Sequence, residues 1–303
     1  MSTSKRVGFI GLGNMGTPMA ANLARGGHDV MAYDIAADRA RRFAQAHAAR
    51  ATESLTELAA HADIVITMLP TGREVRAALI EAQGGALIAG LRPGTIAVDM
   101  SSADPVATRA LGGDLAERRI ALVDAPVSGG VPRATDGTLA IMIGGDGAAV
   151  AAVKPVLASI GRNLFEVGGL GCGHAMKALN NFLAGTSYAA AVEAIVVGRQ
   201  FGLDPAVMTD VINASTGRSF ASESLITQHV LSGKFATGFA LALLAKDVKI
   251  AAELAREIGV DAPLGRLVSD LWGEARDAVG GEQDHTRAFA HWERRAAGPR
   301  ESE

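Results

Sequence analysis

Three glycines near the start of the sequence are spaced so that a backbone turn could receive a phosphate group. They stand in Gly11-Leu12-Gly13-Asn14-Met15-Gly16, between an apolar run and a helical pattern. Gly11 permits a tight turn, Gly13 lets the backbone approach a pyrophosphate, and Gly16 lets the helix pack closely on a sheet. The free N–H groups at the start of that helix attract the phosphates. The segment predicts a dinucleotide site, although the motif alone is weak because glycine-rich turns are common.

Asp34 strengthens this interpretation because it ends the next predicted strand, 18 residues after Gly16. A carboxylate at that place can hold the 2′-hydroxyl of an adenosine ribose and repels a 2′-phosphate. We therefore expect NAD as the cofactor, with NADP as the weaker alternative. A helix-capping role is the other interpretation of Asp34. Arg39, Arg41 and Arg42 are expected on a solvated helix face.

Lys177 and Asn181 suit a different kind of chemistry. They are four residues apart and share one face of a predicted helix that is rich in Ala, Leu and Val. Reducing a carbonyl with hydride creates an alkoxide that needs a proton, and the reverse oxidation removes a hydroxyl proton. A lysine in an apolar cleft can exchange this proton, because desolvation lowers the pKa of an ammonium group. Taken alone, a helical lysine is usually a surface residue.

Two further segments follow predicted strands and offer backbone groups to a ligand. Ser128-Gly129-Gly130 combines a hydroxyl with two unobstructed N–H groups, which suits a carboxylate oxygen. An ordinary glycine-rich turn is the alternative for this segment. Met68-Leu69-Pro70 ends another predicted strand, where its carbonyls and apolar side chains could line a cofactor ribose.

The elements that position these residues follow from the hydrophobic pattern. From Arg6 to about Phe165, runs of Val, Ile, Leu, Ala and Met alternate with helical patterns, as expected of strands buried on both faces. The predicted strands are Val7–Ile10, Asp29–Tyr33, Ile64–Met68, Thr95–Asp99, Ile120–Asp124, Leu139–Ile143 and Asn163–Glu166. The predicted helices include Met15–Arg25, Ala37–Ala46, Arg73–Glu81, Pro105–Glu117 and Ala148–Ser159. This alternation predicts a doubly wound α/β fold of the Rossmann type with a parallel sheet.

After Gly168 the pattern changes, and no convincing strand occurs between residues 174 and 296. A helical pattern from His174 to about Phe201 would be about 40 Å long at 1.5 Å per residue. The further predicted helices are Ala206–Asn213, Phe220–Val230, Phe239–Ile258, Pro263–Val279 and Thr286–Arg295. We expect residues 1–166 to form an NAD-binding Rossmann domain. Residues 167–303 are expected to form an all-α substrate and oligomerisation domain that begins with the long helix.

The composition limits the possible partners. Hydrophobic residues make up 49% of the 303 residues, yet no apolar run reaches the roughly 20 residues of a membrane helix. The surplus apolar surface should be buried in a large core or between the subunits of a homodimer or homotetramer. A net charge of −3, without a run of one sign, argues against a nucleic-acid or membrane surface. The single Cys172 and the missing secretory pattern indicate the cytoplasm.

The remaining polar residues give no second chemistry. Seven histidines lack the spacing of metal ligands, and no metalloprotease, nucleophile-elbow or Walker motif occurs. We therefore expect no metal and neither a hydrolase nor a kinase. His174 could tune the pKa of Lys177, but a packed or solvent-facing histidine is the better expectation. Arg218 could bind a second anionic group on a substrate or form a salt bridge.

Five segments, taken in their order, resemble the β-hydroxyacid dehydrogenase family, which includes 3-hydroxyisobutyrate dehydrogenases and tartronate semialdehyde reductases. They are Gly11–Leu23, Met68-Leu69-Pro70, Asp124-Ala125-Pro126-Val127-Ser128-Gly129-Gly130, Gly171–Asn181 and Lys246-Asp247. The resemblance covers nearly the whole chain. It implies an NAD-dependent oxidation of a short 3-hydroxy acid to its semialdehyde, or the reverse reduction.

The resemblance also implies roles for individual residues. Lys177 would be the general acid/base and Asn181 its substrate-binding neighbour, while Ser128-Gly129-Gly130 would grip the substrate carboxylate. Lys246 would reach the cofactor and substrate region, although an ordinary ion pair is the alternative. The residues implied to bind the cofactor are Gly11, Leu12, Gly13, Asn14, Met15, Gly16, Asp34, Met68, Leu69, Pro70, Glu74, Ser102 and Lys246.

Several alternatives stay open. Glu74 and Ser102, taken singly, would be a helix-start carboxylate and a helix N-cap. An imine reductase has a similar architecture but usually carries another residue at the position of Lys177. A non-catalytic NAD-binding interaction module would be expected to have lost that lysine.

Overall fold

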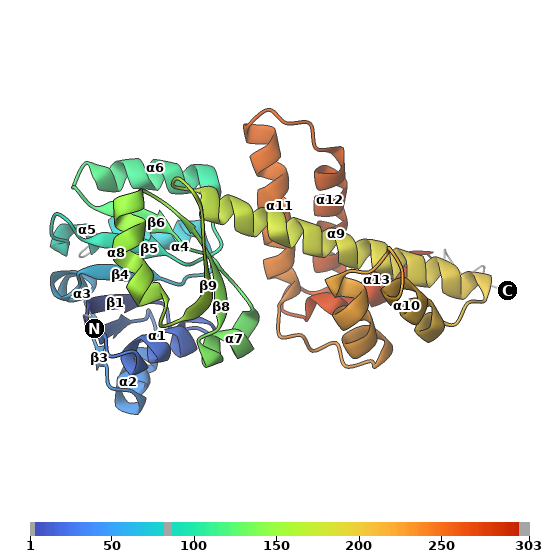
Figure 1. Cartoon of the computed structure of the whole chain (residues 1–303), viewed down its shortest axis with the longest axis horizontal. Coiled ribbons are helices and arrows are strands. Elements are labelled where there is room, and N and C mark those ends of the chain that lie inside the picture. The colour runs from blue at the N-terminus through green and yellow to red at the C-terminus, as the bar shows by residue number, and fades with distance from the viewer. Residues whose placement is uncertain (1–3, 82–86, 297–303) are drawn as a thin grey trace. The chain divides into compact units, whose positions relative to one another are not determined.

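The computed structural model describes residues 4–81 and 87–296 (Figure 1). Its contacts divide the chain into two units, residues 1–177 and 178–303. The division falls inside the long helix α9 (Cys172–Phe201), whose first residues are hydrogen-bonded to a strand of the first unit. The expected domain limits at residues 166 and 167 stay a prediction.

Nine strands among the described residues form one sheet in the first unit. Their order is β3-β2-β1-β4-β5-β6-β8-β7, and β9 pairs with β8. The strands are β1 (Arg6–Ile10), β2 (Asp29–Tyr33), β3 (Arg50–Ala51), β4 (Ile64–Thr67), β5 (Ile96–Asp99), β6 (Ala121–Asp124), β7 (Val127–Ser128), β8 (Leu139–Gly144) and β9 (Gly161–Gly168). All neighbours are parallel except β6–β8 and β7–β8. The predicted doubly wound fold is confirmed, with an antiparallel addition at β7 and β8.

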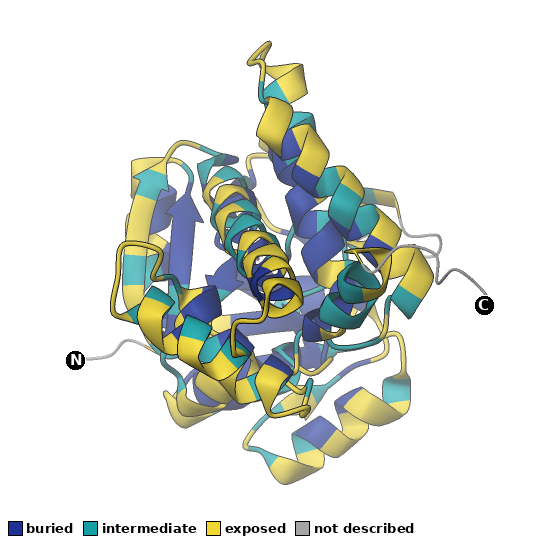
Figure 2. Cartoon of the chain, turned by 90° about the vertical axis from the view of Figure 1, so that its right-hand side faces the viewer, coloured by how far each residue is buried: buried dark blue, intermediate teal, exposed yellow. Residues whose placement is uncertain are grey.

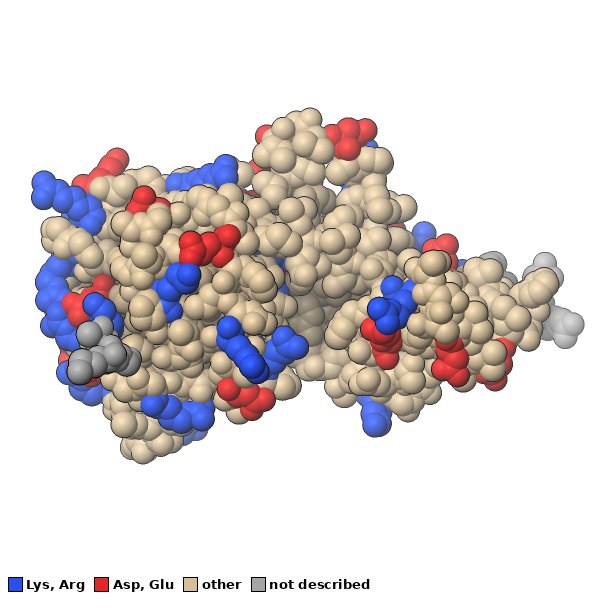
Figure 3. Space-filling model, in the orientation of Figure 1, with Lys and Arg blue, Asp and Glu red and all other residues tan. Residues whose placement is uncertain are grey.

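The helices of the first unit carry both buried and exposed residues, and Figure 2 shows the burial along the chain. The helices are α1 (Gly16–Arg25), α2 (Ala37–Ala46), α3 (Leu55–His61), α4 (Gly72–Arg76), η1 (Ala77–Glu81), α5 (Leu87–Gly90), α6 (Pro105–Ala116), α7 (Gly130–Asp136) and α8 (Gly147–Leu157). The single helix expected over 73–81 is divided into α4 and the π-helical η1. Acidic and basic side chains occur on both units (Figure 3).

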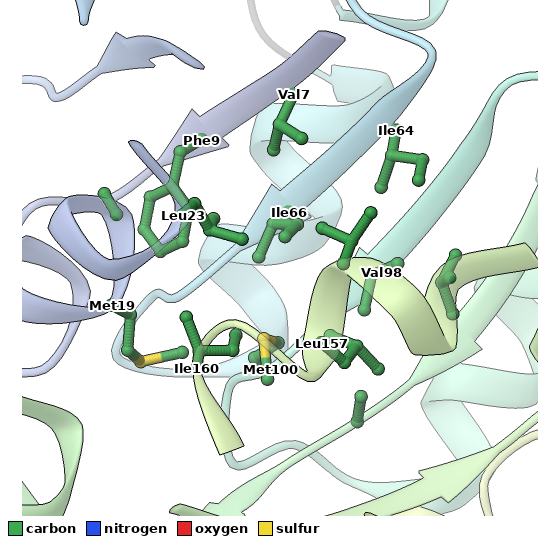
Figure 4. Close-up of a cluster of buried hydrophobic side chains, with 14 of the residues drawn as sticks. Val7, Phe9, Met19, Leu23, Ile64, Ile66, Val98, Met100, Leu157 and Ile160 are labelled. Atoms are coloured by element: carbon green, nitrogen blue, oxygen red, sulfur yellow. The ribbon is translucent and has the colours of Figure 1, made fainter. Parts of the chain in front are cut away.

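The hydrophobic core of the first unit lies on both faces of the sheet. On β4, Ile64 and Ile66 belong to one buried cluster and Val65 to another, because successive side chains of a strand point to opposite faces. Figure 4 shows part of the first cluster, where Phe9 of β1 and Leu23 of α1 lie close together. This packing fixes α1, and hence the preceding glycine-rich turn, against the sheet.

The second unit is helical, as the sequence predicts. It comprises the rest of α9, α10 (Pro205–Asn213), η2 (Ala221–Leu231), α11 (Leu241–Glu257), α12 (Pro263–Val279), η3 (His285–Arg287) and α13 (Ala288–Ala296). Among its described residues, the β-type pairing consists of one isolated antiparallel bridge between Ala240 and Asp284. The core centres on Tyr188 and Trp272, and the Tyr188 hydroxyl donates to Thr286 O at 2.7 Å. Helix α9 has the length and apolar composition of a membrane span, a property that core helices of soluble proteins also have.

Candidate active site

The glycine-rich turn between β1 and α1 has the shape that its sequence predicts. Gly11 has φ +98° and donates from its N–H to Tyr33 O at 2.9 Å. A Cβ at Gly11 would lie 2.3 Å from Met68 O, and one at Gly16 would lie 1.8 Å from Gly11 O. At Gly13, by contrast, a Cβ would meet nothing within 4 Å. Gly11 and Gly16 are therefore needed for the turn itself, while the open side of Gly13 fits an approaching pyrophosphate.

Asp34 is buried at the end of β2, with 6% of its surface exposed, and it holds the glycine-rich turn directly. Its carboxylate accepts from Leu12 N at 2.8 Å and from Ala36 N at 2.9 Å. The N-cap of α2 is Ala36, so Asp34 is not that helix's capping residue. Arg39 Nη1 lies 3.1 Å from both carboxylate oxygens of Asp34. Arg39 is exposed, as expected of a solvated helix face, and its guanidinium also pairs with the buried carboxylate of Asp34.

A cavity of about 570 Å³ lies beside the glycine-rich turn. Its lining includes Gly13, Asn14 and Thr17 from the start of α1, and Arg39 from α2. Thr135 of α7 lines it as well, so the cavity connects the turn to the helix that follows the Ser128 segment. This space can receive part of a dinucleotide.

Met68-Leu69-Pro70 follows β4 and lies against the same turn. Met68 N donates to Ile10 O at 2.9 Å, and Leu69 N donates to Ser101 Oγ at 3.0 Å. Ser101 follows β5, so neighbouring strand ends are tied together here. Ser102 is partly buried, and the cap of α6 is Asp104, which accepts from Ala107 N at 2.7 Å. The interpretation of Ser102 as a helix N-cap was therefore wrong.

Glu74 stands in the first turn of α4 and is exposed. It accepts a hydrogen bond from the hydroxyl of Thr71, the N-cap of the same helix, and this bond lowers the pKa of Glu74. The local contact agrees with the helix-start carboxylate that we kept as an alternative. A role beside the cofactor stays a prediction.

The Ser128-Gly129-Gly130 segment is more regular than the expected loop. Ser128 ends the short strand β7, which pairs with β8, and Gly130 begins α7. Gly129 and Gly130 have φ of +131° and +65°, values that favour glycine. Ser128 is partly exposed and both glycines are exposed, so the segment presents a hydroxyl and backbone to solvent.

Lys177 is partly buried on α9, one turn after the helix begins. The start of that helix is held by Asp124, at the end of β6. The Asp124 carboxylate accepts from Gly171 N at 2.8 Å and from His174 N at 2.7 Å. Sequence analysis quoted Asp124 as part of a motif but gave it no task, because these partners lie almost fifty residues away along the chain.

In the second unit, Asn181 and Lys246 both lie against the carboxylate of Asp247. The sequence alone assigned no role to Asp247. The Asn181 side-chain amide donates to Asp247 Oδ2 at 2.6 Å, and Lys246 Nζ lies 3.6 Å from Asp247 Oδ1. Asn180 donates to Asn181 Oδ1 at 3.1 Å. Asn181 and Asp247 are buried, so this cluster is a fixed arrangement rather than a surface ion pair.

For His174 and Arg218, the structure agrees with the structural interpretation rather than the functional one. His174 is packed, with 1% of its surface exposed. Arg218 is exposed and lies 3.4 Å from Glu223, in a salt bridge on the surface of the second unit. The described residues contain no group of three or more His, Cys, Asp and Glu side chains that could hold a metal ion.

Two family models match successive parts of the chain. Residues 6–169 match the model of the NAD-binding domain of 6-phosphogluconate dehydrogenase. Residues 171–292 match the model described as NAD-binding of NADP-dependent 3-hydroxyisobutyrate dehydrogenase. The chain therefore contains NAD(P)-binding domains.

Individual relatives cover nearly the full length. The 2-(hydroxymethyl)glutarate dehydrogenase of Eubacterium barkeri is 40% identical over 97% of this chain and 96% of its own. The 3-hydroxyisobutyrate dehydrogenase of Pseudomonas aeruginosa is 35% identical over 88% of this chain and 90% of its own.

Solved structures give the same result. A structure of the Mycobacterium tuberculosis 3-hydroxyisobutyrate dehydrogenase with L-serine superposes with a TM-score of 0.86 and 32% identity, covering 96% of this chain and 99% of that one. An imine reductase from Myxococcus stipitatus, at 17% identity, 96% and 99% coverage and a TM-score of 0.65, shares the fold alone. The chain belongs to the β-hydroxyacid dehydrogenase family, whose members oxidise the CH–OH group of hydroxy acids.

Proposed function

We propose that the protein oxidises short acids of the form HOCH₂–CH(R)–COO⁻ to their semialdehydes, or catalyses the reverse reduction, with NAD as the preferred cofactor. The relatives are named for 2-(hydroxymethyl)glutarate, 3-hydroxyisobutyrate and L-serine. These three compounds share a carboxylate and a hydroxymethyl group on the same carbon and differ in R. The common part is therefore the substrate class that we assign to this chain.

The observation that carries the proposal is that four residues of the candidate site lie at the same edge of the sheet. Strands β1, β2, β4, β5 and β6 are parallel, so their carboxyl ends lie at one edge. Gly11, Asp34, Met68 and Asp124 all end or follow these strands. Ligands of doubly wound sheets bind outside the carboxyl ends of the strands.

Each group has a separate task in the proposed reaction. Bound NAD would accept or supply the hydride at its nicotinamide ring. Ser128 and the two glycines after it hold the substrate carboxylate through a hydroxyl and backbone N–H groups. Lys177 takes the hydroxyl proton during oxidation and returns it during reduction. Asn181, oriented by Asp247, holds the substrate oxygen, and Lys246 contacts the cofactor and substrate.

The preference for NAD is supported by the buried carboxylate of Asp34. Two backbone N–H groups and Arg39 keep this carboxylate at the end of β2. There it can accept from a ribose hydroxyl, and its charge repels a 2′-phosphate.

The absorbance of NADH at 340 nm tests this function. We expect turnover with NAD and all three acids of the stated form, and little with lactate, in which the hydroxyl is on the α-carbon. Turnover of lactate in preference to the three acids would overturn the substrate assignment. Turnover only with NADP would overturn the cofactor assignment.

We also propose that the chain forms a homo-oligomer through apolar residues at the end of α9 and on α10. Phe201 is 86% exposed, and Val197, Val207 and Val211 are each about 60% exposed. Exposed apolar residues spaced one turn apart on each of two helices are what an interface between subunits would cover. Light scattering should give at least a dimer for the wild type and a smaller species for Phe201→Asp. A monomeric wild type would contradict this proposal.

A further inference from the structure

Four polar side chains form a buried cluster under the first turn of α9, and no step of the proposed reaction uses them. They are Asp99 at the end of β5, Thr108 of α6, Asp124 at the end of β6, and His174 of α9. Asp99 is 2% exposed and Asp124 is fully buried. All four lie in the first unit, three residues or more before Lys177. Burying two carboxylates is costly, so the cluster needs an explanation.

Asp124 supplies the cap of α9 from a distant part of the chain. The first N–H groups of a helix have no partners within the helix. Here the two oxygens of Asp124 accept one bond each, from Gly171 N at 2.8 Å and His174 N at 2.7 Å. Burial raises the pKa of Asp124, and these bonds and the imidazole of His174 oppose that rise. The carboxylate therefore joins the start of α9 to the end of β6.

Two glycines show that the helix start has no room to shift toward the sheet. A Cβ at Gly173 would lie 2.4 Å from Met142 O and 2.7 Å from Asp124 O. A Cβ at Gly144 would lie 2.6 Å from Asp124 Oδ1 and 2.8 Å from Gly173 N. The backbone of α9 is in direct contact with the ends of β6 and β8, and only glycine permits that contact.

His174 connects the same turn to two further elements. Its Nδ1 lies 2.8 Å from Thr108 Oγ1, and the Thr108 hydroxyl donates to Asp104 O at 2.8 Å. Because that hydroxyl has one proton, it accepts from Nδ1–H when it donates to Asp104. On its other side, His174 Nε2 lies 3.6 Å from Asp99 Oδ2. The ring thus joins α9 to α6 by a hydrogen bond, and its Nε2 faces the carboxylate at the end of β5.

Asp99 and Asp124 are the charged groups that face the ring in this cluster. Asp99 Oδ1 accepts from Thr67 Oγ1 at 2.9 Å and from Ser101 N at 3.0 Å, which fixes its position at the strand ends. Asp124 Oδ2 lies 3.9 Å from His174 Nδ1. The imidazole therefore lies between two carboxylates that cannot move.

We propose that Asp124 and His174 are positioning residues that fix Lys177 relative to the carboxylate-binding segment. Ser128 is four residues after Asp124, and Lys177 is three residues after His174. One carboxylate thus sets the positions of the segment that would hold the substrate carboxylate and of the lysine that would exchange the proton. The proposal rests on the function proposed above. It explains why the helix carrying the lysine is anchored to the strand that leads to Ser128.

Single-turnover reduction of a semialdehyde by bound NADH tests the proposal. We expect His174→Leu to slow this step by about 10- to 100-fold, because small displacements of reacting groups have effects of that size. Binding of NADH, followed by its fluorescence, should stay at the wild-type level. His174→Gln keeps a donor for Thr108 and should recover part of the rate. Thr108→Val, which removes only the hydroxyl, should give a smaller loss in the same direction.

Asp284→Asn provides a matched control. Asp284 is also a capping aspartate, partly buried, and it accepts from Thr286 N at 3.1 Å and Thr237 N at 2.6 Å in the second unit. This variant should lose thermal stability without slowing the single turnover of the folded protein. A wild-type rate in folded His174→Leu and Thr108→Val would overturn the proposal and leave the cluster a purely structural role.

The outcomes also separate this proposal from the proposed function. If the wild type fails to reduce any semialdehyde, the function is wrong. If the wild type is active and Lys177→Ala is inactive, the function stands, and the His174 and Thr108 variants then decide the positioning role. Should His174→Leu not fold, Thr108→Val and His174→Gln decide it by the same two readouts.

Discussion

The side-chain amide of Asn181 donates to Asp247 at 2.6 Å, and both side chains are buried. Asn181 is on α9 and Asp247 on α11, 66 residues apart in the chain. One N–H of the amide is therefore committed to the carboxylate. Its orientation is fixed before any substrate arrives, which is the arrangement that a substrate-holding group requires.

Removal of this carboxylate should affect both stability and activity. Asp247→Ala leaves the amide of Asn181 without its acceptor, which we expect to cost about 1–3 kcal/mol in the free energy of unfolding. The kcat/KM for the hydroxy acid should fall about 10-fold or more, because the amide is no longer oriented. Lys249→Ala, which removes an exposed lysine two residues further along α11, is the control and should change neither. Equal kcat/KM values in the two variants would contradict the role given to Asp247.

Asp34 should control the choice between cofactors. In Asp34→Ser the carboxylate that repels a 2′-phosphate is gone, and Arg39 is released from its partner. We expect the ratio of kcat/KM for NAD to that for NADP to fall at least about 10-fold, as one lost charge interaction permits. Arg39→Ala should weaken any residual use of NADP more than the use of NAD. An unchanged ratio in Asp34→Ser would show that this carboxylate does not face the ribose.

Two glycines of the phosphate-binding turn should respond differently to the same substitution. A Cβ at Gly16 would lie 1.8 Å from Gly11 O, so Gly16→Ala should lower the free energy of unfolding by about 1–3 kcal/mol or more. A Cβ at Gly13 meets nothing within 4 Å, so Gly13→Ala should fold normally. It should instead raise the KM for NAD by obstructing the pyrophosphate. Thermal unfolding and cofactor titration separate the two effects, and a Gly13→Ala enzyme with wild-type NAD binding would contradict the site.

The stability of the second unit should depend on pH through His285. Burial lowers the pKa of His285 from its ordinary value of 6.5. Below pH 6.5 the unfolded chain therefore binds more protons than the folded protein. The contribution of neutral His285 to the free energy of unfolding is complete above pH 6.5. It is lost as the pH falls through the lowered pKa of His285. His285→Gln should reduce the fall in Tm between pH 7 and pH 5, and an equally steep fall in this variant would refute the assignment.

The main elements of the fold could be predicted because their signals are local. The four residues of β4 are apolar or small and fully buried, and Pro105 and Pro205 mark the starts of α6 and α10. The glycine spacing of residues 11–16 likewise depends on neighbours within one turn. Helices α3, α5 and α7 were missed because each is at most seven residues long and shows less than two turns of periodicity.

The contacts that orient the candidate site could not be predicted, because they join distant parts of the chain. Asp124 meets the start of α9 at a separation of 47 and 50 residues. Arg39 was expected in solvent, since its helix is strongly charged, and only the fold shows that Asp34 lies within its reach. The sequence motif names the residue types, and the three-dimensional structure shows which of them share a hydrogen bond.

The rate of NADH formation by Lys177→Ala, at saturating substrate, tests the central claim most directly. Lys154→Ala, which removes an exposed lysine that pairs with Glu166, is the matched control. The account predicts that kcat falls roughly 10²- to 10⁴-fold in Lys177→Ala while NADH binding is retained, and that Lys154→Ala keeps the wild-type rate. A Lys177→Ala enzyme with the wild-type kcat would contradict the assignment of proton transfer to this lysine.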